Sequence, residues 1–161
     1  MWNELLDVLG KMNLVYRDVL TLGEKKHGTL VAIDMKGLDD LLKQEQELLH
    51  QVQKLEKRRK EVMGKLAASV RGLTPESKME ELFSYAPSKP VEDRLKTLHK
   101  GLNELLRKVE ERNQNNKILT QAALDAVGFH LNRLSGATAG TTYGNGGEDR
   151  VSQNKTLDFK A

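Results

Sequence analysis

Four histidines are the residues best suited to bind a metal or to transfer a proton, but their spacing suits neither task. His27, His50, His99 and His130 are far apart in the sequence. Metal-binding histidines on a helix usually occur as close pairs, such as positions i and i+4, so that both imidazoles reach one ion. The chain has no such pair and no cysteine. We therefore expect no metal site, disulfide or thiol chemistry, and we interpret the histidines as surface or helix-seam residues.

The acidic pairs and the glycine-rich stretch are equally poor candidates for catalysis. Glu80-Glu81 and Glu110-Glu111 are neighbours, which point to different sides of a helix and form no acid–base dyad. Gly144-Asn145-Gly146-Gly147 resembles a phosphate-binding loop only superficially, because the preceding strand, the lysine and the following helix are missing. No nucleophile motif occurs in a fitting context. The sequence predicts a protein that is not an enzyme and needs no cofactor.

The composition favours long charged helices. Of 161 residues, 38% are hydrophobic, 4% are aromatic and 30% are charged, with only three prolines, which fits extended helices better than a compact β-sandwich. The acids Glu4 and Asp7 interrupt any secretory signal, and no apolar run approaches the roughly 18 residues of a membrane span. We expect a cytoplasmic protein. Its net charge of +3 is too small to indicate a polyanionic partner.

Apolar spacing predicts three long helices, over residues 2–33, 36–70 and 90–134. The first carries apolar residues at Leu5, Leu9, Met12, Tyr16, Val19, Leu30 and Ile33. Gly23 and Gly28 weaken it, since each glycine costs roughly 1 kcal/mol relative to alanine in a helix. The predicted fold is all-α, an elongated antiparallel helical bundle or coiled coil with a helical domain over residues 1–134.

Two capping signals mark the connections between these helices. Asp34 is the predicted N-cap of the second long helix. Thr74-Pro75-Glu76 supplies a capping residue, a proline suited to the first helical position and an acid at the positive helix end. We expect a short connecting helix from there to about Tyr85, which Pro87 and Pro90 terminate.

The second long helix carries a heptad seam typical of a bundle or coiled coil. Its positions are Leu41, Glu45, Leu48, Val52, Leu55, Arg59, Val62 and Leu66. Arg59 either fixes the register or lies at the bundle edge with its head group in water, which we favour. The basic stretch over residues 54–60 could suggest nucleic-acid binding. Interleaved Glu56 and the absence of aromatic residues favour a solvated face instead.

The third long helix changes character along its length. Val91, Leu95, Leu98, Leu102, Leu105, Leu106 and Val109 fall within an arc of about 100°, the width of one core-facing stripe. The apolar residues that follow spread over roughly 240°, more than one neighbouring helix can cover. They are Ile118, Leu119, Ala122, Ala123, Leu124, Ala126, Val127, Phe129, Leu131 and Leu134. Further parts of the chain or another molecule must cover this wide face, and we favour a partner.

A polar cluster separates the narrow and wide halves, and a glycine-rich tail follows them. Asn113, Gln114, Asn115 and Asn116 form the cluster. Asn116 falls on the seam, where it is either buried, hydrogen-bonded and register-fixing, or part of an exposed segment. Residues 135–161 contain mostly Gly, Thr, Ser, Asn and charged residues, with too little apolar surface to offset the entropy of ordering. We predict a disordered tail there.

The order of these parts resembles the FlgN family of flagellar type III export chaperones. DMKGLDDLL (residues 34–42), EQELL (45–49) and LEKRR (55–59) are similar to the family's second helix. NQNNKIL (113–119) resembles its polar-then-apolar third helix, and Tyr143-Gly144 a short element of its tail. LDFKA (157–161) is a weaker match.

The resemblance implies that the hook–filament junction proteins FlgK and FlgL are the clients, kept unpolymerised until export. It implies that the wide apolar end of the third helix binds them. The expected client-binding residues are Ile118, Leu119, Ala122, Leu124, Val127, Phe129, Leu131 and Leu134. It further implies that Tyr143, with Gly144, docks to the cytoplasmic domain of the export-gate protein FlhA. No nucleic-acid partner and no stable membrane insertion are expected.

Three other interpretations remain open. The heptads also suit a structural coiled-coil protein that forms a homodimer. A nucleic-acid-binding helical protein and a chaperone for a different secreted helical client are the other two. A broad apolar face tends to self-associate when it is uncovered. The oligomeric state of the pure protein therefore distinguishes the structural homodimer from the chaperone.

Overall fold

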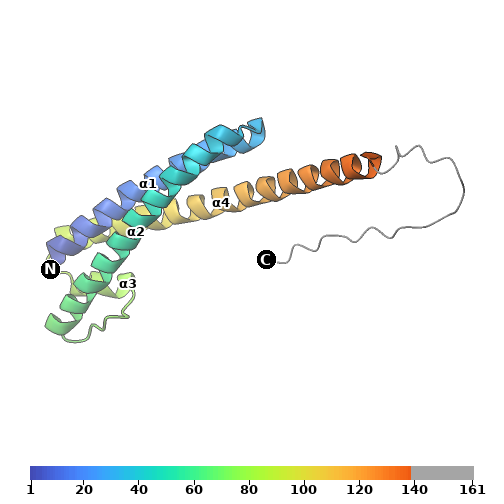
Figure 1. Ribbon diagram of the computed structural model, residues 1–161. Coiled ribbons are helices and arrows are strands. Elements are labelled where there is room, and N and C mark those ends of the chain that lie inside the picture. Colours follow the sequence, from blue (N-terminus) through green and yellow to red (C-terminus); the bar gives the residue numbers. More distant parts are fainter. Residues whose placement is uncertain (139–161) are drawn as a thin grey trace, which may run out of the picture. The chain divides into compact units, whose positions relative to one another are not determined.

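The computed structural model describes the backbone of residues 1–138 and the side chains of residues 1–135. In chain order the elements are α1 (Trp2–Ala32), α2 (Met35–Ser69), α3 (Met79–Leu82), the 3₁₀ helix η1 (Phe83–Tyr85) and α4 (Lys89–Thr138) (Figure 1). The described residues contain no strand. The predicted all-α fold, with three long helices and a short connecting one, is confirmed. The chain divides into two compact units, Met1–Leu124 and Asp125–Ala161.

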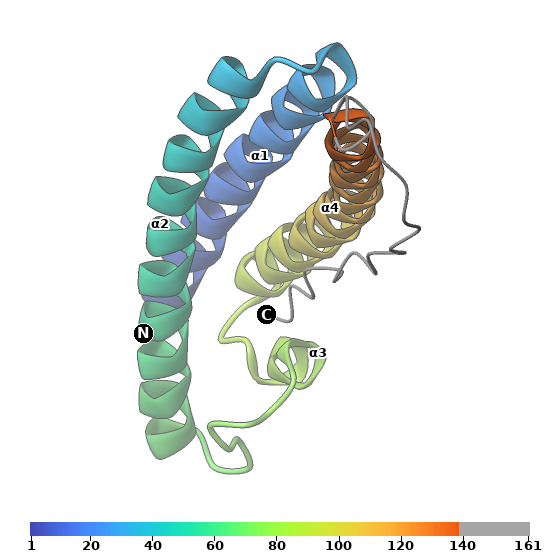
Figure 2. The ribbon, with the colours of Figure 1, turned by 45° about the vertical axis from the view of Figure 1, so that its right-hand side comes forward.

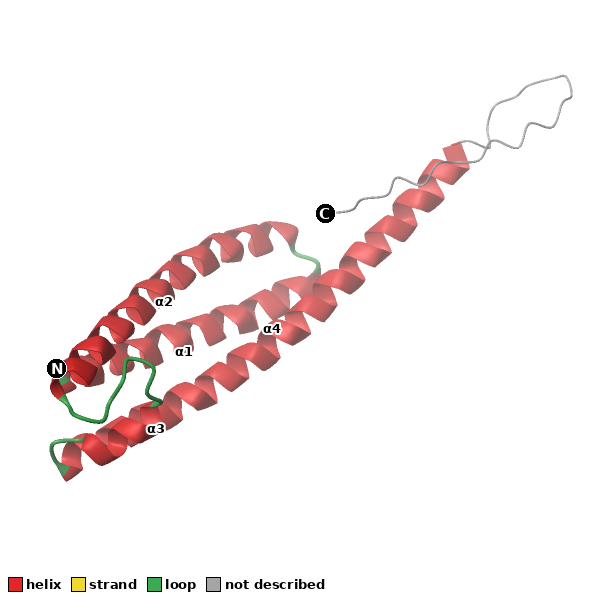
Figure 3. Cartoon of the chain, turned by 90° about the horizontal axis from the view of Figure 1, so that it is seen from below, coloured by secondary structure: helices red, strands yellow, loops and turns green. Residues whose placement is uncertain are grey.

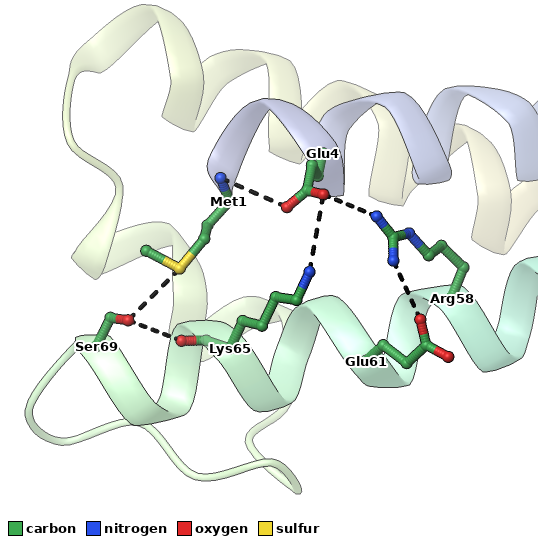
Figure 4. A network of polar contacts seen from close by, with 6 residues as sticks. All are labelled: Met1, Glu4, Arg58, Glu61, Lys65 and Ser69. Carbon is green, nitrogen blue, oxygen red and sulfur yellow. Dashed lines mark hydrogen bonds and ion pairs between the residues drawn. The ribbon is translucent and has the colours of Figure 1, made fainter.

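Helices α1 and α2 form an antiparallel hairpin. At one end, the Arg58 guanidinium of α2 lies 2.8 Å from the Glu4 carboxylate of α1, within a small polar network at the N-terminus (Figure 4). Near the other end, Lys26 Nζ of α1 lies 2.6 Å from Glu45 of α2. The Lys26–Glu45 pair is part-buried, whereas Arg58 and Glu4 are exposed and contribute little to stability. The residue numbers of these pairs rise along α1 and fall along α2, as antiparallel helices require.

The part of α4 that belongs to the first unit packs alongside α1 and runs in the same direction. The Asn13 amide of α1 donates to the Leu98 carbonyl of α4, and the Asn116 amide of α4 donates to the Gly23 carbonyl of α1. The later residue of α1 contacts the later residue of α4, so these two helices run parallel. Helix α2 is antiparallel to both (Figure 2). This is an up-down-up bundle whose second crossover passes through α3 (Figure 3).

The hydrophobic core lies where the N-terminal half of α1 meets the C-terminal half of α2, α3 and the start of α4. The buried residues are Leu5, Val8, Leu9, Met12, Val62, Met63, Leu66, Leu73, Leu82, Leu95 and Leu102. Every predicted seam position of α2, from Leu41 to Leu66, is buried or half-buried. The heptad prediction is therefore confirmed, because burial follows the same spacing of three and four residues.

The turn between α1 and α2 contains an uncommon backbone conformation. The Asp34 N–H donates to the Thr29 carbonyl and the Ile33 N–H to the Leu30 carbonyl, which is the Schellman arrangement of a helix end. Ile33 adopts the left-handed conformation with φ 56° and ψ 34°. Glycine usually occupies this position, because the left-handed conformation costs other residues roughly 1–2 kcal/mol.

The predicted N-cap of α2 is confirmed. The Gly37 N–H donates to Asp34 Oδ1 at 2.9 Å, which satisfies one of the donors left unpaired at a helix start. A Cβ on Gly37 would lie 2.3 Å from the Asp34 carboxylate, so the glycine lets the cap approach closely.

The connecting segment differs from the prediction. Thr74-Pro75-Glu76 does not open a helix: the Ser77 N–H donates to the Thr74 carbonyl, and Ser77 Oγ accepts from the Thr74 N–H. These bonds close a turn, and α3 begins only at Met79. The prediction was wrong because a serine three residues after Thr74 satisfies its backbone locally, as short hydroxyl side chains do.

The helix ends also differ in two places. Pro90 does not stop the connector but lies in the first turn of α4, where a proline lacks no needed hydrogen bond. Helix α4 ends at Thr138, four residues beyond the predicted end at Leu134. Helix α1 is continuous through Gly23 and Gly28, since packing outweighs their propensity cost.

Candidate functional site

The candidate surface is the apolar face that begins on α4 after Asn116. In the first unit it includes Ile118 and Leu124, whose side chains are 59% and 61% exposed. Ala122 is exposed, and Leu119 is half-buried. By contrast, Leu95 and Leu102, on the same helix, are 0% and 7% exposed. Covered apolar residues therefore give way to exposed ones near Asn116.

The second unit continues this apolar composition within α4. Val127, Phe129, Leu131 and Leu134 are each more than half exposed. At about 100° per residue, Val127, Leu131 and Leu134 fall within roughly 60° of one another, whereas Phe129 points about 140–160° away from them. Phe129 meets the His130 ring edge-on, with centroids 5.8 Å apart. The predicted residues therefore occupy two sides of one helix.

Asn116 is the polar residue at which the candidate surface begins, and it is 2% exposed. Its Nδ2 donates to the Gly23 carbonyl at 2.9 Å, and its Oδ1 lies 3.1 Å from His27 Nδ1. Because an amide oxygen only accepts, His27 donates through Nδ1. Of the two alternatives for Asn116, the buried and hydrogen-bonded one is confirmed.

The sequence interpretation missed a second buried asparagine that performs the equivalent role from α1. Asn13 Nδ2 donates both to the Leu9 carbonyl and to the Leu98 carbonyl of α4. A Cβ on Gly101 would lie 2.9 Å from Asn13 Oδ1, so this glycine is required for the approach. The available signal was Gly101 within a strongly periodic helix, since such a glycine often marks close packing.

Gly23 allows the same kind of approach at the other contact. A Cβ there would lie 3.1 Å from Arg112 Cγ. The residue predicted to weaken α1 is therefore buried against α4. Two asparagines, each donating to the other helix's backbone beside a glycine, fix the register of α1 on α4.

The basic stretch of α2 is engaged in ion pairs. Arg59 pairs with Glu56 and is half-buried, in agreement with a bundle-edge position. Arg58 pairs with both Glu4 and Glu61. Burial is the main cause of a raised pKa for Tyr16, and the nearby Glu56 raises it further while Arg59 lowers it. These partners pair the two arginines of the stretch locally.

The histidines have separate environments. His27 contacts Asn116, His99 lies 2.9 Å from Glu80, and His130 contacts Phe129. Within residues 1–138, no group of His, Cys, Asp and Glu side chains could hold a metal ion. None of the helices in this range is long and apolar enough to span a membrane.

The predicted gate-docking residues, Tyr143 and Gly144, lie outside the described residues, as does the rest of the predicted tail from residue 139.

Comparison with known proteins gives one match. A family model with the description "FlgN protein" matches residues 1–150, which include the whole described chain and the Tyr143-Gly144 element. No curated protein and no solved structure matches the chain.

Proposed function

Because this chain belongs to the FlgN family of flagellar export chaperones, we propose that it escorts the hook–filament junction proteins FlgK and FlgL in the cytoplasm. The apolar face of α4 over residues 118–134 binds a terminal helix of the client. Binding prevents premature assembly, and the complex is then delivered to the flagellar type III export gate.

The exposed apolar side chains of α4 are the observation that supports this proposal. Six large ones, Ile118, Leu124, Val127, Phe129, Leu131 and Leu134, are each more than half exposed. Exposed apolar groups in such number commonly mark a protein interaction site. Covering them releases roughly 25 cal/mol per Å² of buried apolar surface before ordering costs, so binding requires no nucleotide or metal.

The exposed apolar side chains recur along α4 over residues 118–134, and an amphipathic client helix would cover such a row. Anchors spaced at i, i+3, i+4 and i+7 on a client helix fit between the side chains of α4. One such helix contacts the side carrying Val127, Leu131 and Leu134. Phe129, on another side of α4, contacts a second client segment. Because the apolar side chains lie on two sides of α4, a client that covers them all must wrap around the helix.

We assign delivery of the client to the export gate to the segment that follows α4. Family likeness supports Tyr143, with Gly144, as the contact for the cytoplasmic domain of the export-gate protein FlhA. A tyrosine offers a large contact area with little rotamer freedom to lose, which suits a short docking element.

A structural homodimer is the second candidate. Leu42 and Leu49 lie seven residues apart on α2 and are 42% and 50% exposed, which is the spacing of a coiled-coil seam. Pairing of these residues and of the α4 face with a second copy would cover the same apolar surface.

Co-purification of Phe129→Asp with FlgK and with FlgL tests the proposed function. A carboxylate in an apolar interface is costly, so client retention should fall at least tenfold while helical content by circular dichroism is unchanged. The matched control is Asn113→Asp, which places the same charge on an exposed position of α4 outside residues 118–134. This control should retain the client.

Two results distinguish the remaining possibilities. Retention of both clients by Phe129→Asp contradicts the proposed binding face. Sedimentation that shows a tight dimer converted to monomer by the same substitution favours the structural homodimer. Tyr143→Ala separates delivery from binding: it should keep the client and lose binding to the FlhA cytoplasmic domain.

A further inference from the structure

Helices α1 and α4 border a groove of about 600 Å³ in the first unit, where they run side by side (Figure 3). All of its lining residues belong to these two helices. Three of them are apolar: Leu6 and Leu98 are half-buried, whereas Leu14 is 60% exposed. We call this feature the α1–α4 groove. It precedes Asn116 on α4, whereas the proposed client-binding face follows that residue.

Gly10 leaves a gap in the wall that α1 contributes to the groove. Leu6, Gly10 and Leu14 follow one another at intervals of four residues, so they lie on one face of the helix. A Cβ on Gly10 would meet no atom within 4 Å, so no packing inside the described chain requires a glycine here. The two leucines thus flank an open space. One apolar side chain of a neighbouring helix fits such a space, as a knob fits a hole in helix packing.

Two arginines without an acidic partner lie in the same groove. Arg17 and Arg94 are exposed, and among residues 1–135 neither makes a hydrogen bond or an ion pair. Asp7 and Lys11, the other charged residues of the lining, pair with each other at 2.7 Å. The uncompensated charge of the groove is therefore positive and comes from the two arginines.

The two arginines are separated along the groove. Asn13 of α1 contacts the Leu98 carbonyl of α4. Arg17 follows Asn13 by four residues, and Arg94 precedes Leu98 by four residues. Because the two helices are parallel and rise about 1.5 Å per residue, the backbones of the arginines are about 12 Å apart along the groove. Two acids at positions i and i+7 or i+8 of one helix have the same separation, about 10.5–12 Å.

This combination favours a protein helix over other anionic partners. Single-stranded nucleic acids stack their bases on aromatic side chains, and none of the described lining residues is aromatic. Anionic lipids attract clusters of about four or more basic residues, whereas only two here are unpaired. A small anion would leave the leucines and the space over Gly10 uncovered. An amphipathic helix uses all of these features, because it presents acids and apolar residues side by side.

We infer that the α1–α4 groove binds an acidic amphipathic helix of a partner protein. An apolar side chain of that helix enters the space over Gly10, between Leu6 and Leu14. Two acids about two turns apart on the helix pair with Arg94 and Arg17. This inference does not rest on the proposed client-binding face, because no residue of that face lines the groove.

Binding of synthetic peptides, measured by fluorescence anisotropy, tests the inference. The probes are helical peptides of about 15 residues with a row of leucines and two glutamates at i and i+7, placed in each register relative to that row. The same peptides with lysine in place of glutamate are the control probes. At least one glutamate peptide should bind, and its affinity should fall as salt rises from about 50 to 500 mM, because exposed charges are screened. No binding by any glutamate peptide, or equal binding by the lysine peptides, would overturn the inference.

Charge reversal tests the two arginines. Arg17→Glu and Arg94→Glu should each weaken binding of the glutamate peptide about three- to tenfold. Arg71→Glu is the matched control, because Arg71 is an exposed arginine outside the groove. It should bind the peptide with unchanged affinity. Equal losses in all three variants would show that only the net charge of the protein matters, which contradicts binding in the groove.

A second pair of variants fills space without changing charge. Gly10→Leu places a side chain in the open space, where a Cβ meets no atom within 4 Å, so the thermal midpoint should not fall. Its affinity for the peptide should fall about tenfold. Gly28→Leu is the control, because a Cβ on this glycine of α1 also has no neighbour within 4 Å and Gly28 lies outside the groove. Equal affinity of the two variants would contradict the inference.

Three further results would assign the groove to another ligand and overturn the inference. Inorganic phosphate that displaces the peptide, where sodium chloride of equal ionic strength does not, would indicate a small-anion site. Self-association of the pure protein that Arg17→Glu abolishes would indicate a second copy. Binding of a DNA oligonucleotide that Arg17→Glu and Gly10→Leu both abolish would indicate a nucleic acid. None of these results affects the proposed chaperone function, which Phe129→Asp tests separately.

Discussion

Asn116 specifies the register of α1 on α4 more strictly than the apolar residues around it do. Its amide donates to the Gly23 carbonyl and accepts from His27 Nδ1, so both ends of the side chain are bound to α1. A buried amide is stable only when its hydrogen bonds are made. Displacement of α1 along α4 by one residue would break both bonds. Asn116 therefore specifies one register among those that the leucines alone would permit.

Asn116→Ala should destabilise the folded protein by about 1–3 kcal/mol, because the substitution removes two buried hydrogen bonds and leaves His27 Nδ1 without its partner. Urea unfolding followed by circular dichroism measures the change. Asn115→Ala is the control: Asn115 is exposed, and the same gain in helix propensity applies to both variants. Equal stability of the two variants would show that the Asn116 bonds contribute nothing.

The sequence could place Asn116 on the seam but could not decide whether it is buried. Its partner on α1 is the backbone carbonyl of Gly23, and a glycine leaves no trace in an apolar pattern. The same reason explains why Asn13 was missed. Residue-type patterns reveal side chains that face each other, whereas these contacts join a side chain to a bare backbone.

At the scale of the element, the glycines of the long helices have opposite roles. A Cβ on Gly101 would lie 2.9 Å from Asn13 Oδ1, whereas a Cβ on Gly28 would have no neighbour within 4 Å. Gly101 is therefore a packing residue of α4. Gly28 only lowers the helix propensity of α1.

Substitution of these two glycines by alanine should therefore change the stability of the protein in opposite directions. Gly28→Ala should stabilise the protein by about 0.5–1 kcal/mol through helix propensity. Gly101→Ala should destabilise it by about 1–3 kcal/mol, because the added methyl displaces Asn13 from a packed interface. Thermal unfolding of both variants under one condition provides the comparison. A stabilising Gly101→Ala would contradict the close approach of α1 and α4.

The docking of α3 on α4 predicts a dependence of stability on pH. Glu80 of α3 has a lowered pKa, caused first by a hydrogen bond from its own backbone N–H and then by one from His99 of α4. A carboxyl whose pKa is lowered on folding stabilises the protein above its ordinary value of 4.5. That contribution is lost as the pH falls through the lower folded value.

Glu80→Gln should therefore lower the thermal midpoint at neutral pH and have a smaller effect in acid, where Glu80 is already protonated. Melting curves recorded between neutral pH and about pH 3 measure the difference. Glu81→Gln is the neighbouring control. If Glu80→Gln reduces stability equally at all pH values, the carboxylate charge is not the cause.

The three long helices could be predicted because the pattern of apolar residues in each is long and strongly periodic. Each of the three long helices begins within a residue of its predicted start, and the seam of α2 is covered at all its positions. The connector was not predictable to the same degree. Thr74 carries both a helix-capping and a turn-forming signal, and the hydrogen bond from the Thr74 N–H to Ser77 Oγ decides for the turn.

At the scale of the whole molecule, the sequence indicated how the apolar residues would be divided between core and surface. Four residues of the predicted narrow stripe, Val91, Leu95, Leu98 and Leu102, pack into or against the core. Leu106 of the same stripe is 39% exposed, so that part of the prediction was wrong, and Ile118, Leu124 and Phe129 are exposed as expected. That these exposed residues bind a client stays a prediction, as does the role of Tyr143. The left-handed backbone of Ile33 was not foreseen, because such a conformation of an isoleucine has no sequence signal.

The uneven distribution of buried residues has a consequence for the motions of the hairpin. Nearly all core residues gather where the first turns of α1 meet the last turns of α2, and toward the turn only Leu22 and Leu41 are buried hydrophobics. Local opening is easiest where few apolar contacts resist it. The hairpin should thus be anchored at its base and open more readily at its far end, so that its thermal fluctuations are concentrated at the turn between α1 and α2.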